Sequence, residues 1–174
     1  MSLRIVHDHS DAALATAADI WAAATARRDG LAEPRPAVEK LHGLRSALGN
    51  HGAALHLAVR GDEHVGFVVL ITTGHTTEVR YLAVTPTAWG DGVATRLLDH
   101  VARHADAAGS TVVELWVLDD NERAITVYLR AGWATTDNVK TQLDSRRTER
   151  RLERLLAERG PGSSTNDAMP RWRP

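Results

Sequence analysis

The chain of 174 residues contains no cysteine. This absence excludes disulfide bonds, thiolate metal sites and an acyl-enzyme formed on a cysteine. None of the seven serines lies in a Gly-x-Ser-x-Gly turn, so a serine acyl-enzyme has no support either. Any thiol that takes part in the chemistry must therefore come from a ligand.

Long apolar runs are also missing. No stretch is long enough to span a bilayer, and the amino end, MSLRIVHDHS, lacks the apolar segment of a signal peptide. We therefore expect a cytoplasmic protein with no membrane partner. The net charge is only −1, whereas a nucleic-acid-binding module would carry a strong basic patch with interleaved aromatic residues, so we expect no nucleic-acid partner.

Length and composition fit one globular domain, with 43% hydrophobic and 25% charged residues. We predict a domain over residues 1–159. Residues 160–174 are rich in Gly, Pro and Ser and poor in apolar residues, which predicts a disordered tail.

The most informative segment is residues 79–109, VRYLAVTPTAWGDGVATRLLDHVARHADAAG. It predicts a strand, a loop that ends in Gly90-Asp91-Gly92, and a long amphipathic helix that begins directly after the glycines. Glycines let successive backbone N–H groups point to one spot, and the start of a helix adds partial positive charge there. The loop is therefore a candidate site for a phosphate group.

Two other phosphate-binding motifs fit poorly. A nucleotide P-loop ends in Gly-Lys-Ser/Thr, whereas Val93-Ala94-Thr95 follow the second glycine here. A dinucleotide fingerprint would have Gly or Ala in place of Thr95, with its glycines directly at the end of the strand, but residues 85–89 intervene.

The segment Trp89-Gly90-Asp91-Gly92-Val93-Ala94 resembles the pyrophosphate loop of the GNAT acetyltransferase superfamily, Arg/Gln-x-x-Gly-x-Gly/Ala. A second block, LWVLDDNERAITVYLRAGW at residues 115–133, resembles the family's strand followed by Asn-x-x-Ala, Tyr and Gly-Phe/Trp. Two blocks in the right order make the resemblance specific. It implies the α/β GNAT acyltransferase fold, a mixed and mostly antiparallel sheet of six to seven strands with about four flanking helices.

Residue patterns place these elements along the chain. We expect strands at residues 3–6, 55–59, 65–71, 78–84 and 111–117, the last covered on both faces because it is almost wholly apolar. Helices are expected at residues 12–28 and 37–48, after Gly92 and after Asn121. The family implies a last strand at residues 148–154, although the leucines there also suit a helix; we favour the strand.

The resemblance implies acetyl-CoA as the acetyl donor and CoA as the product, with no metal. Backbone amides of residues 90–95 would hold the pyrophosphate, and Leu82, Ala83 and Val84 would bind the pantetheine arm through main-chain bonds. The Leu82 N–H would polarise the thioester carbonyl, because this strand is splayed from its neighbour in the family. Asn121 resembles the family asparagine that bonds the cofactor's arm, and it also suits a helix cap.

Two side chains are catalytic candidates. Tyr128 matches the family tyrosine that protonates the departing CoA thiolate; its alternative is a core aromatic residue. Glu78 lies on the strand where several family members carry a glutamate base; its alternative is a solvated residue paired with Arg80. Glu114 is a reserve candidate for the base.

Two loop residues depart from the family's pattern. Trp89 replaces Arg or Gln, and Asp91 brings a carboxylate to the loop, which is unfavourable beside a pyrophosphate unless it points outward. Arg96 is a candidate to compensate this charge. Both residues are candidates for cofactor binding; alternatively, Trp89 is a packing residue and Asp91 caps the helix.

His100 and His104 lie one helical turn apart, a spacing that can bind a metal. No third ligand is evident, so we expect both on a solvated helix face.

These features predict an acetyl-CoA-dependent N-acetyltransferase that acetylates a primary amine by direct attack in a ternary complex. The acceptor is a small molecule or a peptide, and a homodimer is left open. The alternative is a non-catalytic acyl-CoA-binding sensor or inactive subunit with the same fold.

Overall fold

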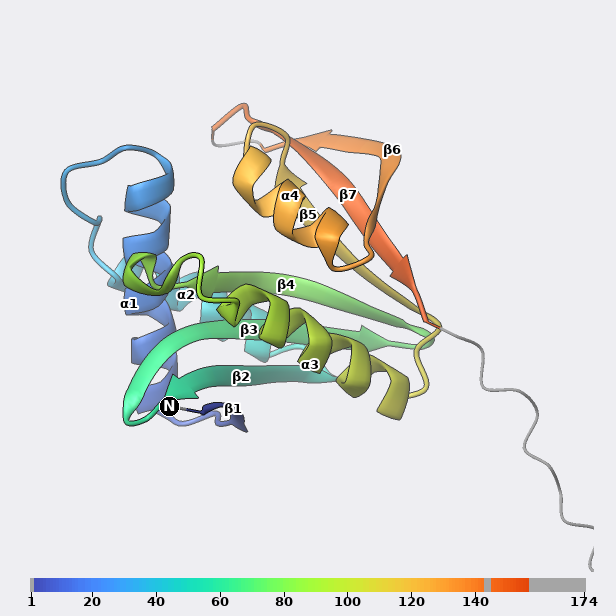
Figure 1. The fold of residues 1–174 in the computed structure, drawn as a ribbon, viewed down its shortest axis with the longest axis horizontal. Helices are drawn as coiled ribbons and strands as arrows, with labels where there is room; N and C mark the ends of the chain where they lie inside the picture. Colours follow the sequence, from blue (N-terminus) through green and yellow to red (C-terminus); the bar gives the residue numbers. More distant parts are fainter. Residues whose placement is uncertain (1, 143–144, 157–174) are drawn as a thin grey trace, which may run out of the picture.

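The structure is a computed structural model that describes residues 2–142 and 145–156. The predicted tail at residues 160–174 lies outside this range. Within the described residues, one mixed sheet of seven strands carries four α-helices (Figure 1). The elements in chain order are β1 (Leu3–His7), α1 (Asp11–Arg28), α2 (Val38–Leu48), β2 (Ala53–Arg60), β3 (Glu63–Thr73), β4 (Thr76–Val84), the 3₁₀ turn η1 (Pro86–Ala88), α3 (Val93–Ala107), β5 (Val112–Leu118), α4 (Glu122–Arg130), β6 (Ala134–Thr141) and β7 (Thr148–Leu155).

The sheet order is β1-β2-β3-β4-β5-β7-β6. Among the described strands, only β4 and β5 pair in parallel, and the other neighbours are antiparallel. The mixed, mostly antiparallel sheet confirms the fold predicted from the resemblance. No helix among the described residues is long and apolar enough to cross a membrane.

The expected last strand is present as β7, which pairs with β5 from Val112↔Leu155 to Leu118↔Glu149. Leu152 is fully buried in the core, whereas Leu155 is 76% exposed. The side chains therefore follow the sheet and do not form the single apolar face that a helix would need. This pairing carries the carboxyl end of the chain next to β5, where it can contribute to a site between β4 and β5.

Two apolar clusters lie on opposite faces of the sheet. Helices α1 and α2 pack on one face over β2, β3 and β4, while α3 packs on the other (Figure 1). The predicted stripe of Val93, Leu97, Val101 and Ala105 is buried on α3, each residue no more than 1% exposed. This packing fixes the direction of α3, and with it the place of the helix start.

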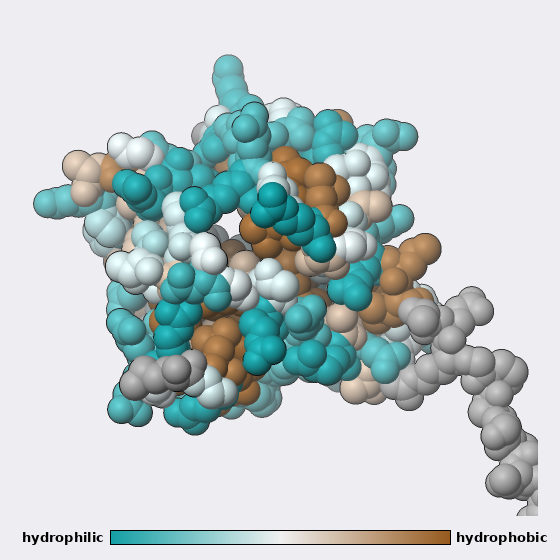
Figure 2. All heavy atoms as spheres, in the orientation of Figure 1, coloured by the Kyte–Doolittle hydropathy of each residue, from teal (hydrophilic) through white to brown (hydrophobic). Residues whose placement is uncertain are grey.

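The expectation that β5 is covered on both faces is wrong. Val113, Leu115 and Val117 are buried, but Glu114 and Trp116, which alternate with them, are half-buried. The reason is that α1 and α2 pack over β2, β3 and β4, while Trp116 borders a cavity. In the space-filling view, hydrophobic residues border an opening between the α4 region and the α1–β4 part of the molecule (Figure 2).

Candidate active site

Strands β4 and β5 pair only from Thr76↔Val112 to Val79↔Leu115 and then separate. The separation begins at a bulge, because the β3–β4 register shifts between Val69 and Leu70 and leaves Arg80 without a partner on β3. A bulge bends its strand and increases the local twist, which turns β4 away from β5. The splay expected from the resemblance is therefore present.

The separated strands open a cavity of about 580 Å³. Of the predicted site residues, Leu82, Asn121 and Tyr128 line it. Residues from α1, α2 and β7 complete its wall. Its aromatic side chains are Trp21 of α1, Tyr81 of β4 and Trp116 of β5. The cavity therefore joins segments from the whole length of the chain.

Backbone groups of β4 face this gap. The Thr85 N–H donates to Val65 O on β3 at 2.9 Å. In an antiparallel pair alternate residues direct their N–H and C=O groups to the same side, so Leu82 and Val84 direct theirs away from β3. The Val84 carbonyl accepts a hydrogen bond from Trp89 Nε1 at 2.7 Å. The Leu82 N–H faces the cavity, whereas the backbone of Ala83 is directed to β3.

The loop of Gly90, Asp91 and Gly92, called the glycine loop below, leads directly into α3. Gly90 and Gly92 have φ of +95° and +76°, which is the left-handed region that favours glycine. Gly92 is the N-cap of α3, and no side chain caps the helix. The first N–H groups of a helix have no partner within it, so those of α3 are open to an anion.

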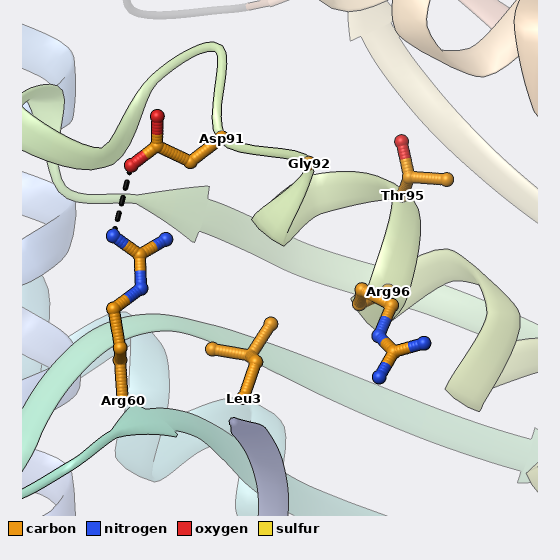
Figure 3. Close-up of a pocket in the computed structure, with 6 residues that line it drawn as sticks. All are labelled: Leu3, Arg60, Asp91, Gly92, Thr95 and Arg96. Carbon is orange, nitrogen blue, oxygen red and sulfur yellow. Dashed lines mark hydrogen bonds and ion pairs between the residues drawn. The ribbon is translucent and has the colours of Figure 1, made fainter. Parts of the chain in front are cut away.

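A second cavity, of about 670 Å³, lies beside the glycine loop (Figure 3). Here the Asp91 carboxylate accepts a hydrogen bond from Arg60 at the end of β2, with 2.8 Å between Oδ2 and Nη1. Asp91 thus points to β2, and Arg60 compensates its charge. Arg96, the predicted compensating residue, lines the same cavity and forms no ion pair with a described residue.

Trp89 is a half-buried packing residue. Besides its hydrogen bond to Val84 O, its ring lies under the Arg123 guanidinium of α4, whose central carbon is 4.5 Å from the ring centroid. Trp89 therefore links the loop to the end of β4 and to the first turn of α4. These contacts match the packing interpretation of this residue.

Tyr128 and Asn121 come to the cavity on α4. Tyr128 is buried, which raises the pKa of its hydroxyl to about 12 and keeps the proton on it near neutral pH. This hydroxyl forms no hydrogen bond with a described residue, although its ring packs 6.0 Å from that of Trp133. Asn121 Oδ1 accepts the Ala124 N–H at 3.3 Å, so the predicted helix cap is confirmed.

Neither predicted carboxylate base lines the cavity. Glu78 accepts a hydrogen bond from Arg80 at 3.0 Å, and Glu114 forms an ion pair with Arg151 at 2.7 Å. Among the described residues, the carboxylates that do line the cavity are Asp29, Glu39 and Glu149.

Sequence reasoning missed these three cavity carboxylates. Asp29 is held by Arg28 at 2.8 Å and by Arg147 at 3.1 Å, and the hydrogen bond from Arg28 lowers its pKa. Glu149 accepts from Gln142 Nε2 at 2.7 Å. No local motif marks them, because the end of α1, the start of α2 and β7 meet at the cavity only in the fold.

The expected solvated position of His100 and His104 is wrong. Both are half-buried, and their ring centroids lie 4.4 Å and 5.2 Å from that of His56 on β2. They are half-buried because their face of α3 packs towards the sheet near β2. His56 is the third histidine of this cluster, which the sequence analysis did not identify. None of the three lines either cavity.

Comparison with known proteins adds three findings. Residues 17–133 match the model of the acetyltransferase (GNAT) family. The mycothiol acetyltransferase of Streptomyces scabiei (strain 87.22) is 39% identical over 87 residues, which are 48% of this chain and only 28% of that relative.

Solved structures share the fold. The ribosomal-protein-S18-alanine N-acetyltransferase of Escherichia coli has a TM-score of 0.72 at 15% identity, over 92% of this chain and 98% of that one. The PaiA N-acetyltransferase of Thermoplasma acidophilum, solved with coenzyme A, has a TM-score of 0.70 at 16% identity, over 90% of this chain and 100% of that one.

Proposed function

Because the chain belongs to the acetyltransferase (GNAT) family, we propose that it transfers an acetyl group from acetyl-CoA to a primary amine. One observation carries this proposal. The gap between β4 and β5 brings the Leu82 N–H and the Tyr128 side chain to the wall of one cavity. A hydrogen-bond donor for a carbonyl oxygen and a protonated acid for a leaving thiolate are the two groups that thioester cleavage needs.

The residues present fit acetyl-CoA. The uncapped start of α3 offers the N–H groups of Gly92, Val93, Ala94 and Thr95 to a pyrophosphate, with the helix dipole in support. The pairing of Asp91 with Arg60 removes the charge conflict that the sequence suggested. When bound, acetyl-CoA supplies an activated acetyl group as a thioester.

The pantetheine arm would extend from the glycine loop along the free edge of β4. Val84 and Leu82 are the residues of β4 that direct backbone groups to that side, and Asn121 lines the same cavity as Leu82. Val84 offers its N–H only, because its carbonyl is bonded to Trp89. Ala83 contributes no main-chain bond in this arrangement.

In the proposed reaction the amine nitrogen attacks the thioester carbon directly, with both substrates bound. A C–N bond forms and the C–S bond breaks. The Leu82 N–H stabilises the charge that develops on the carbonyl oxygen, and Tyr128 donates its proton to the sulfur. The raised pKa of Tyr128 keeps this proton available over the physiological pH range.

The proton of the attacking ammonium must pass to a base. Glu78 remains our prediction, with a water chain past Arg80, which lines the cavity. Glu149 is the second candidate because it lines the cavity itself. Replacing Glu78 and Glu149 by Gln, one at a time, identifies the base as the residue whose loss removes the acidic limb of the kcat/KM pH profile.

The acceptor is a small-molecule or peptide amine that enters between α1, α2 and β7. The cavity is lined by three aromatic side chains, whose ring faces can hold an ammonium group: Trp21, Tyr81 and Trp116. Its three carboxylates lie among five basic side chains, so charge alone does not select the acceptor: Asp29, Glu39 and Glu149 against Arg28, Arg35, Lys40, Arg80 and Arg147.

Steady-state release of CoA from acetyl-CoA, measured across a panel of primary amines, tests the proposed function. We expect amine-dependent release with at least one acceptor. An acyl-CoA-binding sensor would instead bind CoA in calorimetry and release none with any amine, and that result would refute the proposal. Calorimetry on the same preparation would also detect a third outcome, in which the protein binds no CoA at all.

A further inference from the structure

Three histidines from two elements meet on the α3 face of the sheet, outside both cavities. His56 comes from β2, and His100 and His104 come from successive turns of α3. One ring nitrogen from each can be chosen so that all three lie within 4.8 Å of one another. The spacing on α3 brings only His100 and His104 together, whereas His56 joins them through the packing of α3 on the sheet.

Two ring nitrogens of this cluster lack hydrogen-bond partners among the described residues. His56 is only 5% exposed, and its Nε2 is buried with no hydrogen-bond partner among the described residues. The Nε2 of His100 is in the same situation. A buried ring nitrogen without a partner is costly and needs an explanation, and a bound ion is one that would satisfy both atoms together.

The residue type suits a ligand role, because a neutral imidazole has one ring nitrogen lone pair to offer to a metal ion.

We propose that His56, His100 and His104 bind one divalent transition-metal ion of the zinc class, which joins α3 to β2. A tetrahedral zinc ion holds its nitrogen ligands at about 2.0–2.1 Å, which places them about 3.4 Å from one another. Starting from at most 4.8 Å, each pair of nitrogens has to approach by no more than about 1.4 Å.

The ligand set also selects the ion. Three imidazole nitrogens suit zinc, copper, nickel or cobalt, whereas calcium and magnesium need oxygen ligands. A water molecule completes the tetrahedron, with the exposed ring of His7, 5.0 Å from His56, at the border of the cluster. Because the start of α3 carries the proposed pyrophosphate site, the ion would anchor the other half of that same helix.

The test uses the full chain without an affinity tag, treated with chelator and then titrated with Zn²⁺. We expect one ion per chain by calorimetry. At a concentration of a hundred times the dissociation constant, the ion should raise Tm by about 5–10 °C. With Co²⁺, visible d–d absorption of a tetrahedral site should saturate at the same stoichiometry.

Four variants complete the design. His100→Gln and His104→Gln each remove one ligand at a half-buried position, and His56→Leu removes the buried one. Each should lose the Zn²⁺-dependent rise in Tm, while His42→Gln, an exposed histidine on α2, should keep it. In chelator, His56→Leu should melt at or above the wild-type temperature, because it removes an unpartnered buried nitrogen.

Absence of saturable binding at one ion per chain would overturn the proposal. So would Zn²⁺ stabilisation that persists unchanged in His100→Gln and His104→Gln. In either case the three rings would form a packing contact only.

Discussion

Replacing Gly92 by Asp should separate the two roles of the glycine loop, as a turn and as an anion site. A Cβ added at Gly92 meets no atom within 4 Å, so the new carboxylate can stand freely at the start of α3. The positive φ of +76° strains any L residue, although Asp tolerates it better than most. We expect a loss of about 1 kcal/mol in the free energy of unfolding, or about 2–4 °C in Tm.

The effect on binding should be larger than the effect on stability. Two charges about 4 Å apart repel by about 1 kcal/mol in water and by about 4 kcal/mol near a protein surface, which weakens CoA binding between about fivefold and about a thousandfold. Arg60 is already paired with Asp91, so it does not neutralise a second carboxylate. At a hundred times the wild-type dissociation constant, CoA stabilises the wild type by about 2.7 kcal/mol, and a variant bound tenfold more weakly by about 1.4 kcal/mol.

Thermal melts with and without CoA measure both quantities, and Gly74→Asp is the matched control. Gly74, in the turn between β3 and β4, also has a positive φ, +57°, and an open Cβ position. It should lose similar stability and keep the full CoA-dependent shift. If Gly92→Asp binds CoA as tightly as the wild type, the glycine loop is only a turn.

Two further substitutions address single side chains. Tyr128→Phe should lower kcat by about a hundredfold, because the proton donor is lost, while Tm and CoA affinity persist; steady-state kinetics and melts on one preparation check this. Trp89→Phe should lower Tm by about 2–4 °C, because Val84 O loses its hydrogen bond, while the ring keeps its contact with Arg123. Calorimetry should show CoA affinity within about threefold of the wild type, a change of less than about 0.7 kcal/mol.

Opposite outcomes would assign different roles to these residues. An unchanged kcat in Tyr128→Phe would remove Tyr128 from the mechanism, and a large fall in Tm would make its hydroxyl structural. For Trp89→Phe, weak CoA binding with an unchanged Tm would mean that the indole contacts the cofactor.

Local patterns predicted much of the fold. The apolar stripe of α3 from Val93 to Ala105 follows the helical period, and the alternation of apolar residues in the strands follows the strand period of two. Both patterns involve residues close in sequence, so the buried faces could be predicted from them. The glycine loop was readable for the same reason, since positive φ at Gly90 and Gly92 is a local requirement. The strand at β7 needed the family resemblance, because its leucines also fit a helix.

Contacts between distant segments were not predictable in the same way. The splay of β4 depends on a bulge at Arg80, which is a matter of register against β3. Asp91 meets Arg60 from 31 residues away, so the sequence suggested a nearer residue, Arg96, as the compensating charge. The one feature of the sequence that could have pointed to His56 is its position in an otherwise apolar strand. Its neighbours on α3 are known only from the fold, in which that helix packs near β2.

The central claim is acetyl transfer from acetyl-CoA to an amine, and a labelled acetyl group follows it most directly. The measurement incubates the protein with isotopically labelled acetyl-CoA and the best acceptor of the amine panel, then analyses acceptor and protein by mass spectrometry. Direct attack predicts one labelled amide for each CoA released, with no label on the protein. CoA release without a labelled amide, or label retained on the protein, would contradict it.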